Sequence, residues 1–151
     1  MDKKHPYSHW KTQCSVYHIN SVVKYVLQKA RIRIFKKRNW CKDYEAKTDN
    51  GSCCYCDSTL ADKWSAGGAV KREIYDYFPK DYNSARLDNW SYKHRFIQQV
   101  AEAYLEDDVP YGCSLRAYND CKETKHQKII GVFNKTIGQL ERVERQWKWN
   151  D

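Results

Sequence analysis

Apolar residues recur at steps of three and four along residues 15–37, and this period constrains the fold more than any other feature. A helix of that length presents them as one continuous stripe, which has to be buried against other elements. The same period predicts helices over about 57–78 and 90–106, a helical turn at 114–118 and a last helix opened by Thr124. The first stripe comprises Val16, Ile19, Val23, Val26, Leu27, Ala30 and Ile34. These segments together predict an all-α fold, a single compact bundle of four to five helices with a basic first helix.

The second predicted helix carries a feature that helices disfavour. It would begin at Asp57 or Ser58, because both side chains are good N-caps, and it would end before Pro79. Gly67-Gly68 would lie in its middle at a cost of roughly 1 kcal/mol per glycine. The pair indicates either a close approach between helices or a break between two short ones. The buried side would comprise Leu60, Ala61, Trp64, Ala69, Val70, Ile74 and Tyr77. Strand alternation is limited to a short piece around Cys53–Tyr55.

Length and terminal composition indicate one domain without an export or membrane segment. A chain of 151 residues has the usual size of one domain. We therefore expect an N-terminal arm over 1–14 and a single helical domain over 15–151. No stretch approaches the ~20 apolar residues that a membrane-spanning helix needs, and the polar start leads into no signal-peptide core. The seven cysteines are odd in number and irregularly spaced, which favours reduced thiols and a cytoplasmic location.

Short motifs within residues 22–143 resemble those of a known family. The matching residues are Trp40, Gly51, Trp64-Ser65-Ala66-Gly67-Gly68-Ala69, Tyr118-Asn119-Asp120, Thr124, Ile129, Phe133 and Ile137. In this order they resemble a family of small bacterial and phage proteins known only as domain of unknown function 6197. The resemblance implies a helical fold and no assigned activity, so no catalytic residue is carried over. Ser65 stands where the family usually has Cys, which excludes thiol chemistry there, and Tyr118 stands where it usually has Trp.

The net charge of the chain lies in its first third. Residues 1–50 contain twelve Lys or Arg and four Asp or Glu, while the other 101 residues contain fifteen of each. Such asymmetry is typical of a surface that attracts phosphate or acidic protein. The predicted binding residues are Lys24, Arg31, Arg33, Lys36, Lys37, Arg38, Trp40 and Lys42.

Basic residues interleaved with aromatic ones favour a polyanionic partner. Phosphate neutralisation gives salt-sensitive affinity that is independent of sequence, and the rings of Tyr25, Phe35 and Trp40 could stack on exposed bases. A solvated helix face is the alternative interpretation, and an acidic or nucleoprotein partner would serve as well as nucleic acid. We expect a small binding protein rather than an enzyme. Its small size and its resemblance to phage-borne proteins suggest an inhibitor of a host or defence complex.

The cysteines and histidines offer a second hypothesis, a metalloprotein or hydrolase. Cys53 and Cys56 form a Cys-x-x-Cys pair that could bind zinc together with Cys121 and His126, although no second such pair is present and no cofactor is otherwise indicated. Cys41 or Cys113 could also contribute ligands.

A Cys nucleophile would be the enzymatic form of that hypothesis. Cys54 or Cys56 would attack, His94 or His126 would accept the proton and Asp120 would orient the imidazole. The spacing supports no single pairing. Asn119-Asp120 has two readings of its own, a catalytic acid with an amide partner or a turn in which both side chains bond the local backbone.

Overall fold

The computed structural model describes residues 13–78 and 92–149 of the chain. Helices dominate it, which confirms the predicted all-α class, and a small three-stranded sheet is the exception. In chain order the elements are α1 (Gln13–Arg33), η1 (Lys37–Asn39), β1 (Ala46–Lys47), β2 (Cys53–Cys54), β3 (Lys63–Trp64), α2 (Ala66–Tyr77), α3 (Tyr92–Asp107), η4 (Pro110–Gly112), α4 (Leu115–Asp120) and α5 (His126–Trp149). The predicted arm over 1–14 lies outside the described residues, except for the start of α1.

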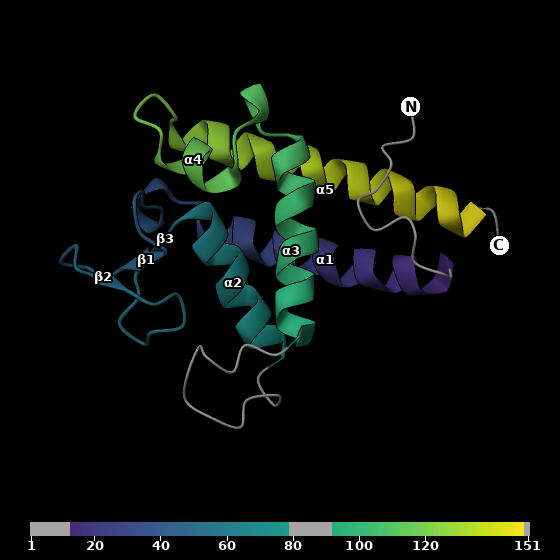
Figure 1. Ribbon diagram of the computed structural model, residues 1–151, viewed down its shortest axis with the longest axis horizontal. Helices are drawn as coiled ribbons and strands as arrows, with labels where there is room; N and C mark the ends of the chain where they lie inside the picture. The colour runs from purple at the N-terminus through teal and green to yellow at the C-terminus, as the bar shows by residue number, and fades with distance from the viewer. Residues whose placement is uncertain (1–12, 79–91, 150–151) are drawn as a thin grey trace.

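The two longest helices, α1 and α5, lie side by side and antiparallel (Figure 1). A ladder of contacts shows their direction, because partners of increasing number on α1 have decreasing number on α5. Its rungs are Lys24 with Glu144, Gln28 with Glu141, Arg31 with Asn134, and the Ile34 carbonyl with His126. α3 crosses the pair in front, and α2 packs against both α1 and α3 (Figure 1).

The core is assembled from the apolar stripes that the sequence predicts. Val23, Val26, Leu27, Ala30 and Ile34 of α1 are fully buried, and Ile19 is partly buried. The side chain of Val16 lies outside the described residues. The rest of the core comes from the other helices: Val70 and Ile74 of α2, Ile97, Val100, Ala101 and Leu105 of α3, and Ile129, Phe133, Ile137 and Leu140 of α5. Burial of each larger side chain contributes about 1.5–3 kcal/mol.

The segment between α1 and α2 forms the small sheet, in the order β2-β1-β3. Ala46 of β1 pairs with Cys54 on one side and with Trp64 on the other, both antiparallel. The expected strand piece at Cys53–Tyr55 is therefore present as β2. The expectation that a helix runs from Asp57 or Ser58 is wrong, because residues 58–64 return along the sheet edge as a turn and β3.

α2 begins at Ala66 because Ser65 caps it, its hydroxyl accepting a hydrogen bond from the Gly68 amide at 3.0 Å. Gly67 and Gly68 consequently occupy the first turn and not the middle of a helix. Leu60 and Tyr77 were expected in the core but are 71% and 41% exposed. Leu60 is exposed because it precedes the helix, in the turn between β2 and β3.

The end of α1 determines where the basic segment lies. α1 ends at Arg33, earlier than the predicted residue 37, so Lys36, Lys37 and Arg38 lie on the connection and on η1. Within residues 13–78 and 92–149, no helix combines the length and apolar character needed to cross a bilayer.

Candidate functional site

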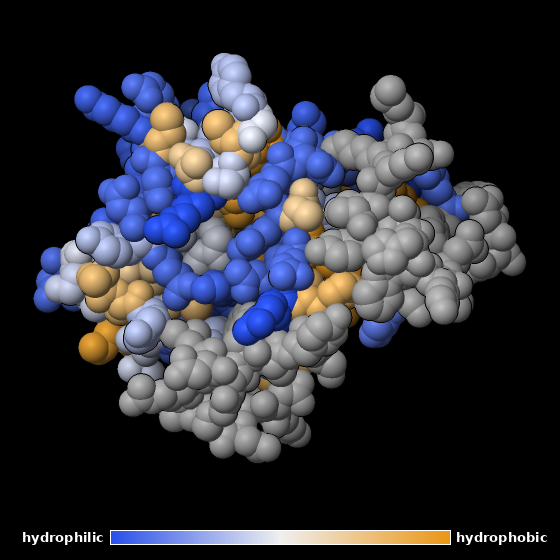
Figure 2. Space-filling model, in the orientation of Figure 1, coloured by the Kyte–Doolittle hydropathy of each residue, from blue (hydrophilic) through white to orange (hydrophobic). Residues whose placement is uncertain are grey.

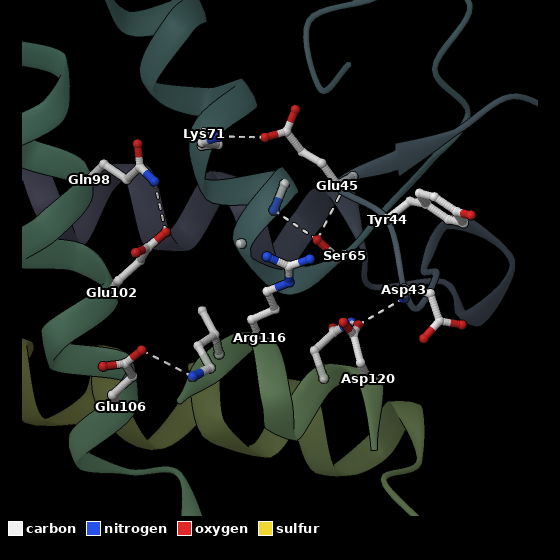
Figure 3. Close-up of a pocket in the computed structure, with 14 residues that line it drawn as sticks. Asp43, Tyr44, Glu45, Ser65, Lys71, Gln98, Glu102, Glu106, Arg116 and Asp120 are labelled. Atoms are coloured by element: carbon white, nitrogen blue, oxygen red, sulfur yellow. Dashed lines mark hydrogen bonds and ion pairs between the residues drawn. The ribbon is translucent and has the colours of Figure 1, made fainter. Parts of the chain in front are cut away.

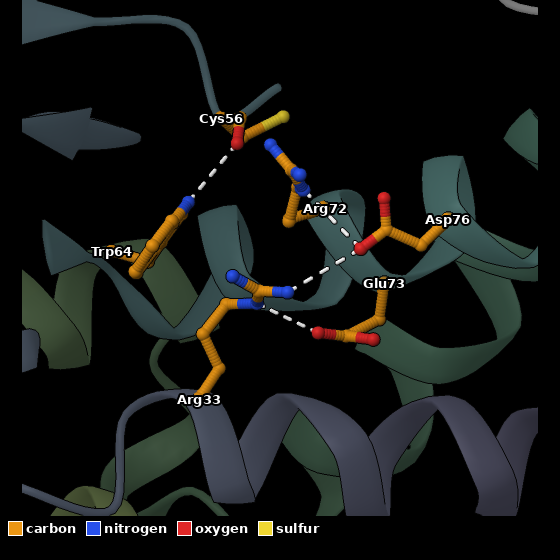
Figure 4. A network of polar contacts seen from close by, with 6 residues as sticks. All are labelled: Arg33, Cys56, Trp64, Arg72, Glu73 and Asp76. Carbon is orange, nitrogen blue, oxygen red and sulfur yellow. Dashed lines mark hydrogen bonds and ion pairs between the residues drawn. The ribbon is translucent and has the colours of Figure 1, made fainter. Parts of the chain in front are cut away.

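Two of the predicted binding residues hold the protein's own fold together. Lys24 forms an ion pair with Glu144. Arg33 donates from Nε to Glu73 at 2.7 Å and from Nη2 to Asp76 at 3.3 Å (Figure 4). Its guanidinium also lies 4.6 Å from the centre of the Trp64 ring. These two cations are occupied in joining α1 to α5 and to α2.

The next cations along the chain face solvent. Lys36, Lys37 and Arg38 are exposed, and none of them forms an ion pair in the part of the chain that the structure describes. Arg31 donates to the neutral amide of Asn134 at 2.9 Å. The positive charge predicted from the sequence is therefore retained at the end of α1.

Lys37 lies at the rim of a groove of about 630 Å³, which we call the basic groove. It is lined by Lys37, Trp40, Lys42, Lys122, Thr124, Lys125, His126 and Gln127. Four lysines from two segments of the chain, 37–42 and 122–127, thus line one depression, and its lining contains no acidic residue. Glu123 lies beside it in the chain but is not part of the lining. Sequence reasoning missed Lys122 and Lys125, because residues 51–151 together carry no net charge.

Two aromatic rings form the wall of the basic groove. The rings of Trp40 and His126 are 5.6 Å apart, and Lys42 Nζ lies 5.4 Å from the Trp40 ring centre. Lys42 also donates to the Cys121 carbonyl at 2.5 Å, so its ammonium is held in place. His126 Nε2 contacts the Ile34 carbonyl at 2.6 Å, which fixes the imidazole against the end of α1.

A second hollow gathers the two motif segments, 64–69 and 118–120, and we call it the motif hollow (Figure 3). Its volume is about 410 Å³. It opens on the face shown in Figure 2, where hydrophilic residues gather between α2, α3 and α4. The lining residues are Asp43, Tyr44, Glu45, Ser65, Gly67, Gly68, Lys71, Gln98, Glu102, Glu106, Leu115, Arg116, Asn119 and Asp120.

Asn119 fastens the motif segments to each other. Its side-chain oxygen accepts from Trp40 Nε1 at 2.8 Å and from the Ala66 amide at 3.0 Å. Its amide nitrogen donates to the Cys41 carbonyl at 3.1 Å and to Asp120 at 2.9 Å. The residue is 1% exposed. This network assigns Asn119 a structural role that is not the local turn role considered from the sequence.

Asp120 completes the junction. Its Oδ1 accepts from the backbone amide of Asp43 at 2.8 Å, and Asp43 has a left-handed φ of 74°. The carboxylate therefore stabilises a backbone conformation that non-glycine residues adopt at a cost.

The charges of the motif hollow come from three helices, α2, α3 and α4, and from the loop before β1. Glu45 accepts from Lys71 Nζ at 2.6 Å and from the Cys56 amide at 2.9 Å. Burial works against the ionised form of Glu45, but these donors outweigh it and lower the pKa of the carboxyl. The Glu45–Lys71 pair is thus neutral as a unit.

Glu102 has a different environment. Its pKa is raised, first because burial disfavours the charged carboxylate, while a hydrogen bond from Gln98 at 3.0 Å works in the opposite direction. Glu106 accepts from the Leu115 amide at 3.1 Å and so caps the start of α4.

The zinc hypothesis has no assembled site in the described structure. Among the residues described, no three His, Cys, Asp or Glu side chains are grouped as metal ligands. Cys56 is fully buried and Cys53 is exposed. Cys121 Sγ lies 3.3 Å from Glu123, and His126 is held at Ile34. The four proposed ligands are therefore not brought together.

The nucleophile hypothesis concerns Cys54 and Cys56, and burial raises the pKa of the half-buried Cys54 thiol. Burial raises the pKa of Cys41 to about 11. Burial and the neighbouring Glu45 raise the pKa of Cys56 further. The buried His94 packs its ring against Tyr75 and Phe78. A thiolate is the reactive form of cysteine, so Cys56 is poorly suited to attack.

Comparison with known proteins supplies a family but no activity. Neither a curated protein nor a solved structure matches the chain. The model of one family matches residues 20–139, which is more than half of the chain and includes both motif segments. By that match, the chain belongs to the "Family of unknown function (DUF6197)".

Proposed function

We propose that this protein binds nucleic acid in the basic groove. The observation that carries the proposal is the convergence of four lysines on one depression whose lining has no carboxylate. Lys36 and Arg38 extend the positive surface beyond the groove, since both are exposed and free of ion pairs in the described structure. A surface of this kind attracts phosphates by releasing condensed counterions.

The aromatic wall favours nucleic acid over an acidic protein as the partner. Trp40 is partly exposed at the groove, and its ring lies near both the ammonium of Lys42 and the imidazole of His126. Rings beside cations are the combination that holds an unpaired base above a neutralised backbone. We therefore infer a preference for single strands over duplex.

α5 adds to the positive potential of the groove. The helix begins at His126, at the groove, and has no acidic residue in its first turn. No carboxylate within the first turn therefore offsets the positive end of its macrodipole. A binding protein of this size could act as a phage- or mobile-element-borne inhibitor, by occupying the nucleic acid of a host or defence complex.

The test compares two charge-matched double variants. Lys37→Gln with Lys125→Gln removes two groove cations, and Lys29→Gln with Arg142→Gln removes two exposed cations outside the groove lining. Fluorescence anisotropy with labelled single-stranded and duplex oligonucleotides, over a salt series, gives the affinity and its salt dependence. We expect the groove variant to bind more weakly and to lose about 2 from the slope of log K against log salt, with little change in the control.

Equal losses in both variants would show that overall charge, and not the groove, attracts the nucleic acid. Failure of the unaltered protein to bind either oligonucleotide at low salt would remove nucleic acid as the partner. An acidic protein would then be the partner class to test against the same variants.

A further inference from the structure

The motif hollow holds charges of both signs, and only some of them are paired with each other within the described residues. Glu45 and Lys71 are paired, and Asp120 is engaged by the Asp43 amide and by Asn119. The Asp43 carboxylate points away from Arg116 (Figure 3), and two acids on α3 and one cation on α4 are left to face the same space. These are the residues that any ligand would meet.

Arg116 supplies the cation. Its side chain extends from α4 into the hollow toward Ser65, at the start of α2 (Figure 3). Within the described residues the guanidinium forms no hydrogen bond or ion pair. A guanidinium presents a planar set of donors that matches a carboxylate, so it is suited to bind one.

Glu102 and Glu106 supply the negative charge. Both project from α3 into the hollow, one turn apart (Figure 3). Each accepts one hydrogen bond, from Gln98 and from the Leu115 amide, and neither is ion-paired in the part of the chain that the structure describes. Their remaining lone pairs can accept from an ammonium group.

We propose that the motif hollow binds a small zwitterion of the amino-acid class, with its carboxylate on Arg116 and its ammonium on Glu102 and Glu106. Its volume of about 410 Å³ is within the range of small-molecule sites. A purely anionic ligand would face the carboxylates of α3, and a purely cationic ligand would face Arg116. A molecule that carries both charges satisfies both walls.

Gly68 shows why the hollow has this shape. A Cβ at this position would lie 1.9 Å from the Glu45 carbonyl oxygen, so the loop that carries Asp43, Tyr44 and Glu45 can approach α2 only over a glycine. Gly67, in contrast, leaves 3.9 Å to Glu102 and lines the hollow without a side chain. The absence of a side chain at Gly67 therefore leaves space in the hollow beside Glu102.

The test is a titration of the isotope-labelled full chain followed by two-dimensional amide NMR. The probes are the standard L-amino acids, each compared with its N-acetyl and its carboxamide derivative. We expect at least one free amino acid to shift the amide resonances of residues that line the hollow. N-acetylation removes the ammonium and carboxamide formation removes the carboxylate, so each derivative should bind about tenfold more weakly or not at all.

Matched variants locate the binding. Glu102→Gln and Arg116→Gln should each weaken binding about tenfold, while Glu123→Gln and Arg95→Gln, at exposed positions outside the lining, should not. Arg116→Lys keeps the charge and should retain part of the affinity. Arg116 and the two control positions are exposed, and a glutamine at residue 102 can still bond Gln98, so the amide spectra should show that all variants are folded.

Three results would overturn the proposal. These are a panel in which no free amino acid shifts the resonances, a derivative that binds as well as its parent, and charge-removed variants that bind like their controls. Equal binding of putrescine, a diamine without a carboxylate, would likewise replace the zwitterion by a simple cation. This outcome can be distinguished from failure of nucleic-acid binding, because none of these substitutions lies in the lining of the basic groove.

Discussion

The fold leaves no room for a side chain at Gly68, but it leaves room for one at the neighbouring Gly67. An added Cβ at Gly68 would meet the backbone of Glu45 at 1.9 Å from O and 2.8 Å from C, and backbone cannot rotate away. At Gly67 the nearest atom would be the flexible Glu102 carboxylate, at 3.9 Å. Two adjacent glycines in one helical turn therefore have opposite tolerances.

Substitution of each glycine by alanine separates these roles. Gly68→Ala should lower the free energy of unfolding by about 1–3 kcal/mol or more, because the loop of Glu45 must move away. Gly67→Ala should raise it by up to about 1 kcal/mol, because alanine favours the helix. Urea denaturation measures both. Equal stability of the two variants would contradict the close approach at Gly68.

Asn119 illustrates what a local sequence pattern does not reveal. Beside Asp120 it fits a turn or a catalytic pair, and both readings concern neighbouring residues. Its actual partners, Trp40, Cys41 and Ala66, are distant in the sequence. Such contacts depend on how the elements pack, so only the folded chain identifies the residue as the junction of the motif segments.

At the scale of elements, the stripes of α1, α3 and α5 were predictable because each is long enough to show a helical period. The start of α2 was not. Strands of two residues, such as β1 and β3, are too short to alternate, and Leu60 and Ala61 happen to continue the helical spacing of α2. Ser65 as the cap was masked by equally good cap residues at 57 and 58.

The ion pair of Glu45 and Lys71 connects the loop before β1 to α2 and should give the protein an acid-sensitive contact. The pKa of Glu45 is lowered in the folded state. Its ionised form therefore adds stability that is complete above the pKa of an unfolded glutamate, about 4.3, and is lost as pH falls through the lower folded value.

Urea denaturation at several pH values tests that contact. Glu45→Gln should be less stable than the unaltered protein near neutral pH, because Lys71 loses its ion partner. The difference should shrink as the medium is acidified below about pH 4. Glu123→Gln, an exposed control, should leave the profile unchanged. A stability difference that is constant with pH would contradict a lowered Glu45 pKa.

At the scale of the whole molecule, sequence counting located the positive charge but not the surface that it forms. Lys24 and Arg33 are neutralised by acids from distant helices. Lys122 and Lys125, in contrast, join the groove from residues 51–151, which together carry no net charge. The motif hollow could not be anticipated as a charged site either, because Glu102, Glu106 and Arg116 belong to no motif and meet only when α3 and α4 pack.

Thiol accessibility reports on the integrity of the entire fold. Cys41 and Cys56 are buried with raised pKa values, while Cys53, Cys113 and Cys121 are exposed. At mildly alkaline pH, iodoacetamide should modify the exposed cysteines first and the two buried ones only when the protein unfolds. Mass spectrometry of the digested protein measures each site over time. Modification of Cys56 as fast as Cys113 in the native protein would contradict its burial.

The basic groove and the motif hollow are separated by two chain segments, 42–43 and 120–122, which we call the partition. Lys42 and Lys122 line the groove, while Asp43 and Asp120, beside them in the chain, line the hollow. Hydrogen bonds from Lys42 to the Cys121 carbonyl and from the Asp43 amide to Asp120 clamp the partition together. A ligand in the groove that displaces these two segments also moves residues that line the hollow, and a ligand in the hollow does the reverse. Thermodynamic linkage then makes any such influence mutual: the factor by which one guest alters the other's affinity holds in both directions.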